Sequence, residues 1–136
     1  MKIINLINKA STDNSLKIGF LGQSGYVLKK KDFTILIDPY LSNYIEDPNG
    51  LNDKRMKRNF PPTIRPEEIN SIDIVLCTHG HHDHMDPWTL EKIKQPFILY
   101  CSETSYKNNK VSLNNDQLKF IDWNKEIKLG EFQITP

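Results

Sequence analysis

The chain has 136 residues, and its 18 Lys and Arg against 17 Asp and Glu give a formal net charge of +1 at pH 7. This length allows one domain or part of one, with a core that buries roughly two-thirds of the unfolded surface. The balanced charge gives no indication of a nucleic-acid partner or a membrane-surface partner. The longest apolar runs, such as 97–101, are far shorter than the roughly 20 residues that cross a bilayer.

The N-terminal segment and the cysteines bear on location. Asn5 interrupts the first apolar residues, so the segment lacks the continuous apolar region of a secretory signal. Cys77 and Cys101 both lie in apolar runs, which favours buried free thiols over a disulfide framework. Together these features favour a reducing, cytoplasmic location.

The first part of the chain alternates apolar and polar residues in short stretches. Residues 16–21 and 26–28 flank a Gly-Gln-Ser-Gly turn and predict a β-hairpin. A third strand at 33–37 should end at Asp38, because the proline that follows cannot donate to a β-ladder. Residues 42–63 are polar and predict a long irregular loop.

The remaining part alternates helix and strand signals. Pro66 is expected at the first turn of a helix, Asp86 as the N-cap of a second, and Ser102 at the start of a third. The expected strands are 72–77, 97–101, 119–122, 126–129 and 132–135. Strands followed by strand–helix alternation predict an α/β fold built on a mixed sheet.

A histidine cluster carries the chemistry of this sequence. All four histidines lie within residues 79–84, directly after a predicted strand, and Asp83 lies among them. Imidazole nitrogen and carboxylate oxygen suit zinc, manganese or iron, and the cluster contains no thiolate. A histidine-rich tract can also bind metal adventitiously, and that reading stays open.

The spacing predicts how the cluster could divide between two cations. In an extended stretch, side chains two positions apart point the same way, so His79 and His81 could converge on one cation. Asp83 and His84 could then reach a second, whereas His82 should point away towards solvent. Two cations roughly 3.5–4 Å apart can share a water and lower its pKa, and Asp83 could hold or accept the proton.

The stretch from Thr78 to Asp86 resembles the metal-binding signature of the metallo-β-lactamase superfamily. It is most similar to the branch that contains L-ascorbate-6-phosphate lactonases and related metal-dependent hydrolases. Further agreeing stretches are 20–26, 35–41, 61–62 and 86–90. The resemblance implies an αββα sandwich in the α/β (α+β) class, of which residues 1–136 would form about the first half as a single partial domain.

Carried over by position, the resemblance implies the roles of the site residues. His79 and His81 would bind a first divalent metal ion, and Asp83 and His84 a second, with zinc or manganese as the metal. Asp83 would also act in catalysis.

Two further aspartates would support these ligands. The resemblance places Asp38 behind the metal loop, where it would orient the ligands, and we expect Asp86 to support them as well. A plain turn-forming Asp-Pro is the alternative for Asp38.

The sequence departs from the superfamily after His84, because no histidine follows it. A catalytic zinc generally takes three protein ligands, and in this superfamily the others come from the second half of the fold. The isolated chain is therefore expected to lack part of its site. A truncated product, a C-terminal half on another chain, and a homo-oligomer that covers an open sheet face all remain possible accounts.

A basic run at 54–58 lies in the long loop. Arg58 is the candidate contact for an anionic, phosphorylated substrate, and a solvated basic loop is the alternative. The leading hypothesis is a hydrolase that uses metal-activated water to open a lactone or cleave an ester of a small molecule. The rivals are a phosphodiesterase of the same superfamily and a catalytically dead half-domain that acts only in association.

Overall fold

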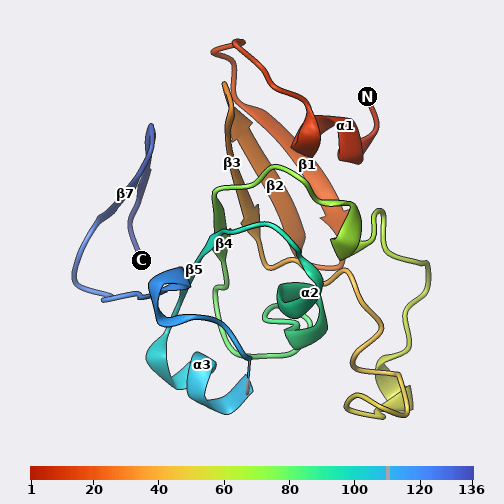
Figure 1. The fold of residues 1–136 in the computed structure, drawn as a ribbon. Helices are drawn as coiled ribbons and strands as arrows, with labels where there is room; N and C mark the ends of the chain where they lie inside the picture. The colour runs from red at the N-terminus through yellow and green to blue at the C-terminus, as the bar shows by residue number, and fades with distance from the viewer. Residues whose placement is uncertain (110) are drawn as a thin grey trace.

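A mixed six-stranded sheet forms the centre of the protein, in a computed structural model that describes residues 1–109 and 111–136 (Figure 1). The strands follow one another in chain order across the sheet. The first three pair antiparallel, and each later strand pairs parallel with the one before it. The strands are β1 (Lys17–Gly22), β2 (Gly25–Lys30), β3 (Phe33–Ile37), β4 (Ile74–Leu76), β5 (Ile98–Cys101) and β6 (Leu118–Phe120).

Three short helices and a second, two-stranded sheet complete the architecture. The antiparallel hairpin pairs β7 with β8, separately from the main sheet. The remaining elements are α1 (Ile3–Asn8), α2 (Pro87–Lys92), α3 (Glu103–Asn109), β7 (Ile127–Leu129), β8 (Phe132–Ile134) and the 3₁₀ turns η1 (Lys54–Met56), η2 (Pro66–Glu68) and η3 (Asn115–Gln117). Among the described residues, no helix has the length and apolar character needed to cross a bilayer.

The predicted strands and two of the three predicted helices are confirmed, and the strand ends differ from the predicted ones by at most two residues. The helix expected at Pro66 is a single 3₁₀ turn, because the backbone at Ile69 is already extended and leads into β4. Helix α1 was not predicted. It is six residues long and forms by burying Leu6 and Ile7 against the sheet, a tertiary contact that a short local pattern does not reveal.

The two faces of the main sheet are covered to different extents. One face packs Val27, Leu36, Val75 and Leu99 into a large core, to which all three helices contribute. Both cysteines lie in this core as free thiols, as expected. Burial raises the pKa of the Cys101 thiol to about 11, so it is inert at neutral pH.

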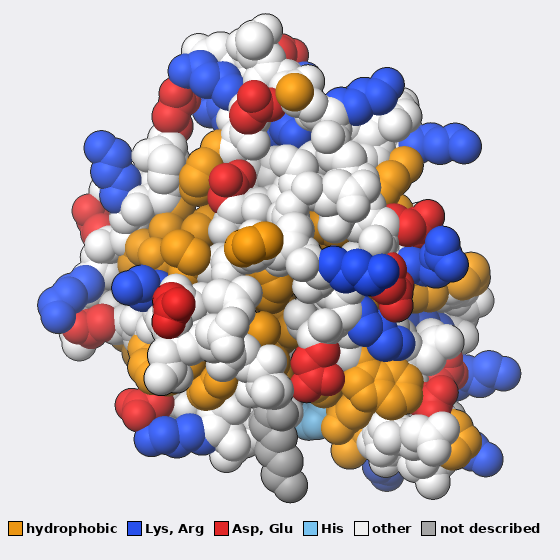
Figure 2. All heavy atoms as spheres, viewed as in Figure 1, with side chains coloured by type: hydrophobic (Ala, Val, Ile, Leu, Met, Phe, Trp, Pro, Cys, Tyr) orange, Lys and Arg blue, Asp and Glu red, His pale blue; other side chains and the backbone are white. Residues whose placement is uncertain are grey.

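The opposite face is covered in part by the β7–β8 hairpin. Leu129 packs on Ile35, Ile74 and Leu76, and thereby begins a second layer. The hairpin leaves part of this face uncovered at β1 and β2, where three large hydrophobic side chains stay exposed: Ile18, Phe20 and Tyr26. Hydrophobic side chains also reach the surface between charged groups in Figure 2. The observed class is the predicted one, a mixed α/β fold with a central mixed sheet.

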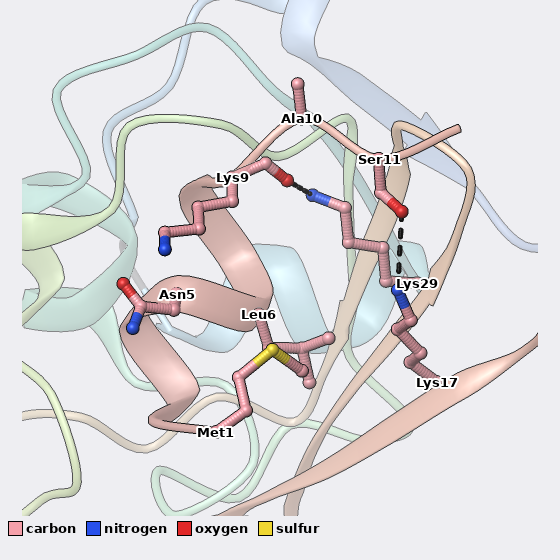
Figure 3. Close-up of a pocket in the computed structure, with 8 residues that line it drawn as sticks. All are labelled: Met1, Asn5, Leu6, Lys9, Ala10, Ser11, Lys17 and Lys29. Atoms are coloured by element: carbon pink, nitrogen blue, oxygen red, sulfur yellow. Dashed lines mark hydrogen bonds between the residues drawn. The ribbon is translucent and has the colours of Figure 1, made fainter. Parts of the chain in front are cut away.

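A buried lysine fixes α1 on the sheet at the end of β2 that lies away from the β1–β2 turn. Lys29 is 2% exposed, and its ammonium donates to the carbonyl oxygens of Ile7 and Lys9 at 2.9 and 2.8 Å. These carbonyls belong to the C-terminal end of α1, where a cation is favoured. Figure 3 shows the pocket beside them, where Lys17 also donates to Ser11. Desolvation lowers the pKa of Lys29.

Candidate metal centre

Three chain segments meet at one edge of the main sheet. The parallel strands β3 and β4 end there, with Ile37 beside Leu76. The antiparallel β1–β2 turn reaches the same edge, because Tyr26 pairs with Ile37. Asp38, the turn 22–25 and the histidine loop are therefore brought together, although up to 60 residues separate them in sequence.

The histidine loop is folded back on itself rather than extended. The N–H groups of His84 and Met85 both donate to the carbonyl oxygen of His81, and buried Met85 anchors the turn. The loop also lies close against α3. A Cβ atom built on Gly80 would come within 3.1 Å of the Ser105 backbone, so this position favours glycine.

Because the loop turns, three imidazole rings come together instead of two. The ring centroid of His79 lies 3.9 Å from that of His84 and 4.6 Å from that of His81. His79 and His81 lie together as expected, but the backbone from 78 to 81 is bent rather than extended, and the ring of His79 is close to both of the others. Desolvation and the neighbouring imidazoles lower the pKa of His79, which favours the neutral form that can bind a metal ion.

Asp38 lies behind the loop and fixes the orientation of His84. Its Oδ2 atom accepts from Nδ1 of His84 at 2.8 Å, and its Oδ1 accepts from the backbone N–H of Thr78 at 2.7 Å. A carboxylate can only accept, so Nδ1 of His84 carries the hydrogen and Nε2 presents a lone pair to the cluster. Asp38 is 4% exposed and has φ 45°, a left-handed conformation that aspartate tolerates better than most residues.

The same carboxylate also reaches His79, through Thr78. The hydroxyl of Thr78 donates to Oδ2 of Asp38 at 2.7 Å and lies 3.1 Å from Nδ1 of His79. Since the single hydroxyl hydrogen goes to Asp38, the oxygen of Thr78 accepts from His79. His79 therefore also carries its hydrogen on Nδ1 and directs Nε2 away. Sequence reasoning gave Thr78 no role beyond its place in the motif.

Asp83 approaches His84 from the other side of the cluster. Its Oδ2 atom lies 3.7 Å from Nε2 of His84. The side chains of Gln23 and Ser24, from the β1–β2 turn, lie against this pair. The sequence marked both only as turn residues, and their approach depends on the pairing of β1, β2 and β3.

Among the described residues, the hydrogen bonds of Asp86 go to α2 and to the segment after β3, and none goes to an imidazole ring. It caps α2 through the N–H of Trp88 at 3.1 Å and accepts from the hydroxyl of Thr89 at 2.5 Å. It also accepts from the N–H of Ser42 at 3.1 Å, which fixes the segment after β3 to α2. Its N-cap role is confirmed. These contacts hold together two segments next to the histidine loop, and they do not include a candidate metal ligand.

His82 points away from the other imidazoles, but it does not stand free in solvent. Its ring stacks on Tyr44, with a centroid distance of 5.1 Å and an interplanar angle of 18°. Trp88 meets the same tyrosine edge-on at 5.4 Å. This aromatic stack packs the histidine loop against the long loop, so His82 has a packing role.

Arg58, the candidate anion contact, is engaged by the main chain. Its Nε donates to the carbonyl oxygen of Ser42 at 3.1 Å, and a terminal nitrogen donates to the carbonyl oxygen of Tyr40. The guanidinium also lies 3.7 Å over the Tyr40 ring. These contacts fold the long loop against the segment after β3, and an anion contact by Arg58 stays a prediction.

The donor atoms of the cluster are of the kinds that bind divalent cations, and hydrogen bonds from behind hold the histidines in orientation. Two imidazoles present Nε2 lone pairs fixed by Asp38 and Thr78, and a carboxylate lies beside them. Across residues 1–109 and 111–136, however, no group of three or more His, Cys, Asp or Glu side chains is arranged to hold one metal ion. The described residues thus supply oriented donor atoms without a complete coordination set.

The family relationship agrees with this arrangement. A family model for the beta-lactamase superfamily domain matches residues 17–136. The chain belongs to the metallo-β-lactamase superfamily.

Several known proteins are similar to the chain. It is 33% identical over 121 residues to the UPF0173 metal-dependent hydrolase YtkL of Bacillus subtilis, covering 88% of this chain and 46% of YtkL. It is 38% identical over 69 residues to a UPF0173 metal-dependent hydrolase of Paracoccus denitrificans, covering 51% of this chain and 24% of that protein. A solved isothiocyanate hydrolase from Delia radicum gut bacteria superposes with a TM-score of 0.57 at 17% identity, covering 83% of this chain and 43% of that one. That similarity shows the fold alone.

The lengths of these relatives differ from that of the chain. It spans 46% of YtkL and 32% of an uncharacterised Mycobacterium tuberculosis protein to which it is 21% identical over 124 residues.

Proposed function

We propose that the chain supplies metal ligands to a metal-dependent hydrolase that opens a lactone or cleaves an ester of a small molecule with metal-activated water. One observation carries the proposal: Asp38 fixes His84 directly and His79 through Thr78, so both rings present Nε2 at one strand edge. Buried carboxylates behind histidines are typical of metal sites. Family membership and the similarity to YtkL support the same reaction class.

The residues that would hold the metal are His79, His81, Asp83 and His84. When bound, divalent cations lower the pKa of a water molecule and polarise a carbonyl oxygen. We propose two such ions, zinc or manganese, because the donors are nitrogen and oxygen atoms without a thiolate.

The chain's own residues would then position ligands and move a proton. Asp38 fixes Nδ1 as the hydrogen-bearing nitrogen in His84 directly and in His79 through Thr78, and the lowered pKa of His79 favours its neutral form. Asp83 would take the proton of the attacking water at a carboxylate oxygen. The substrate would be a small molecule, with a phosphorylated lactone as the first candidate. The protein would be located in the cytoplasm.

A catalytically dead half-domain is the second candidate. It is favoured by the incomplete coordination set, since among the described residues no three donors are arranged around one point. Such a domain would bind metal weakly and act only in association, with a second copy or with a chain that supplies further ligands.

A substrate panel tests the proposal. The purified chain, supplied with Zn²⁺ or Mn²⁺, is assayed on lactones, on simple esters and on a chromogenic phosphodiester. Turnover of lactones or esters that disappears in Asp83→Asn, with the fold retained by circular dichroism, supports the hydrolase. Turnover of the phosphodiester alone favours a phosphodiesterase, and no turnover on any substrate favours the half-domain.

A further inference from the structure

The β1–β2 turn, residues 22–25, brings two side chains against the Asp83–His84 pair. Nε2 of Gln23 donates to Oδ2 of Asp83 at 3.2 Å. The hydroxyl of Ser24 lies 3.4 Å from Nε2 of His84. Oδ2 of Asp83 is the same oxygen that lies 3.7 Å from that nitrogen, so Gln23 engages the carboxylate oxygen that faces the neighbouring ligand.

The backbone at Gln23 is held in a conformation that costs free energy. Its φ is 54°, in the left-handed region, where a residue with a Cβ atom is less stable than glycine. Gly22, directly before it, has φ 97°. A glycine would fit position 23 with less strain, but it would offer no amide to Asp83. Strain of this kind is concentrated at functional positions.

The two sides of the pair are held differently. The Asp38 carboxylate fixes the imidazole of His84 at its Nδ1 atom. Asp83 has a side chain that is 17% exposed, and the amide of the exposed residue Gln23 reaches it. An amide donor orients a carboxylate without neutralising its charge, so the carboxylate keeps its affinity for a cation.

We propose that Gln23 is a positioning residue for metal binding, which orients the Asp83 carboxylate so that it and Nε2 of His84 face one cation. This inference rests on the proposed function, because it takes Asp83 and His84 as metal ligands. Hydrogen bonds to ligating groups of this kind change metal affinity by roughly 10–100-fold when they are removed.

Replacement of Gln23 by glycine separates positioning from stability. In Gln23→Gly, zinc affinity, measured by competition with a chromophoric chelator, should fall roughly 10–100-fold. The thermal unfolding midpoint of the metal-free protein should stay the same or rise, because glycine relieves the left-handed strain. Cobalt absorption of the loaded protein should change as well, since it reports the ligand arrangement.

A second variant and a matched control complete the design. Gln23→Asn keeps the amide and tolerates a left-handed backbone, but it is one methylene shorter, and it should also bind zinc more weakly. Gln133 makes an equivalent pair away from the site, donating to Oε2 of Glu126 at 2.6 Å. Gln133→Asn should therefore bind zinc like the unchanged chain.

Each outcome decides the proposal. Weaker zinc binding in both Gln23 variants, without loss of thermal stability and without change in the Gln133 control, supports it. Zinc affinity equal to that of the unchanged chain overturns it, and so does an affinity loss that only follows a fall in stability. An unchanged chain that binds no zinc overturns this inference together with the proposed function. Metal binding that depends on Gln23 in a chain that hydrolyses nothing leaves the inference standing and overturns only the proposed reaction.

Discussion

The two sides of the histidine cluster are held by different means. Asp38, which is almost fully buried, fixes His84 directly and His79 through Thr78. His81 is exposed, and Asp83 is reached from the β1–β2 turn. The first pair is therefore set by the sheet itself, because Asp38 follows β3 and the loop follows β4. Asp83 depends on the β1–β2 turn, and this side of the cluster can more easily be retuned by substitution.

Replacement of Asp38 by asparagine should have the largest effect, because it removes the charge that both anchored histidines depend on. We expect zinc affinity to fall roughly 10–100-fold. The free energy of unfolding should fall by roughly 2–3 kcal/mol, since three hydrogen bonds to a buried carboxylate are weakened. Chelator competition and urea denaturation measure the two effects. Asp122→Asn, in an exposed turn, is the control, and an Asp38→Asn protein with unchanged zinc affinity would contradict the anchoring role.

Replacement of Lys29 by methionine should lower the stability of the fold without changing the histidine cluster. The variant keeps the aliphatic stem but leaves the carbonyls of Ile7 and Lys9 without the ammonium, at a cost of roughly 1–3 kcal/mol. Urea denaturation measures this cost, and zinc affinity should stay the same. A parallel loss of zinc affinity would show that the two ends of the sheet are coupled.

The pH dependence of stability sharpens the same test. Desolvation lowers the pKa of folded Lys29 below the ordinary 10.5, so the unfolded chain binds this proton more tightly. The contribution of Lys29 to the free energy of unfolding should therefore rise as the pH rises from the folded pKa towards 10.5. The rise should be absent in Lys29→Met, as measured by urea denaturation across alkaline pH. An identical pH profile in both proteins would contradict the lowered pKa.

Replacement of Thr78 by valine tests the relay to His79 within the anchored pair. Valine has the shape of threonine but no hydroxyl, so Nδ1 of His79 loses its acceptor and the ring can take either tautomer. Zinc affinity should fall by about tenfold, at the lower end of the effects of supporting hydrogen bonds. Thr78→Ser keeps the hydroxyl and should restore the affinity. Equal losses in the valine and serine variants would show that only packing matters at this position.

Sequence predicted the strands and the candidate ligands because both are local. Alternating apolar and polar residues indicated β1 to β3. The histidine-rich stretch indicated the candidate donors without information from any other part of the chain. The tautomers of His79 and His84 could not be predicted, since they depend on Asp38, some 40 residues earlier. Gln23 was hidden for the same reason, because only strand pairing brings its turn to Asp83. Family resemblance supplied a position for Asp38 but no role for Thr78 or Gln23.

Replacement of His82 by alanine should have the smallest effect on the cluster and completes the comparison. Its ring stacks on Tyr44 and points away from the other imidazoles, so zinc affinity should stay the same. Loss of the stack should lower the free energy of unfolding by about 1 kcal/mol, because an aromatic pair contributes on that scale. Tyr44→Leu should cost a similar amount, and the double variant should cost less than the sum, since the two residues share one contact. A zinc affinity that falls in His82→Ala as far as in His81→Ala would make His82 a ligand and contradict its packing role.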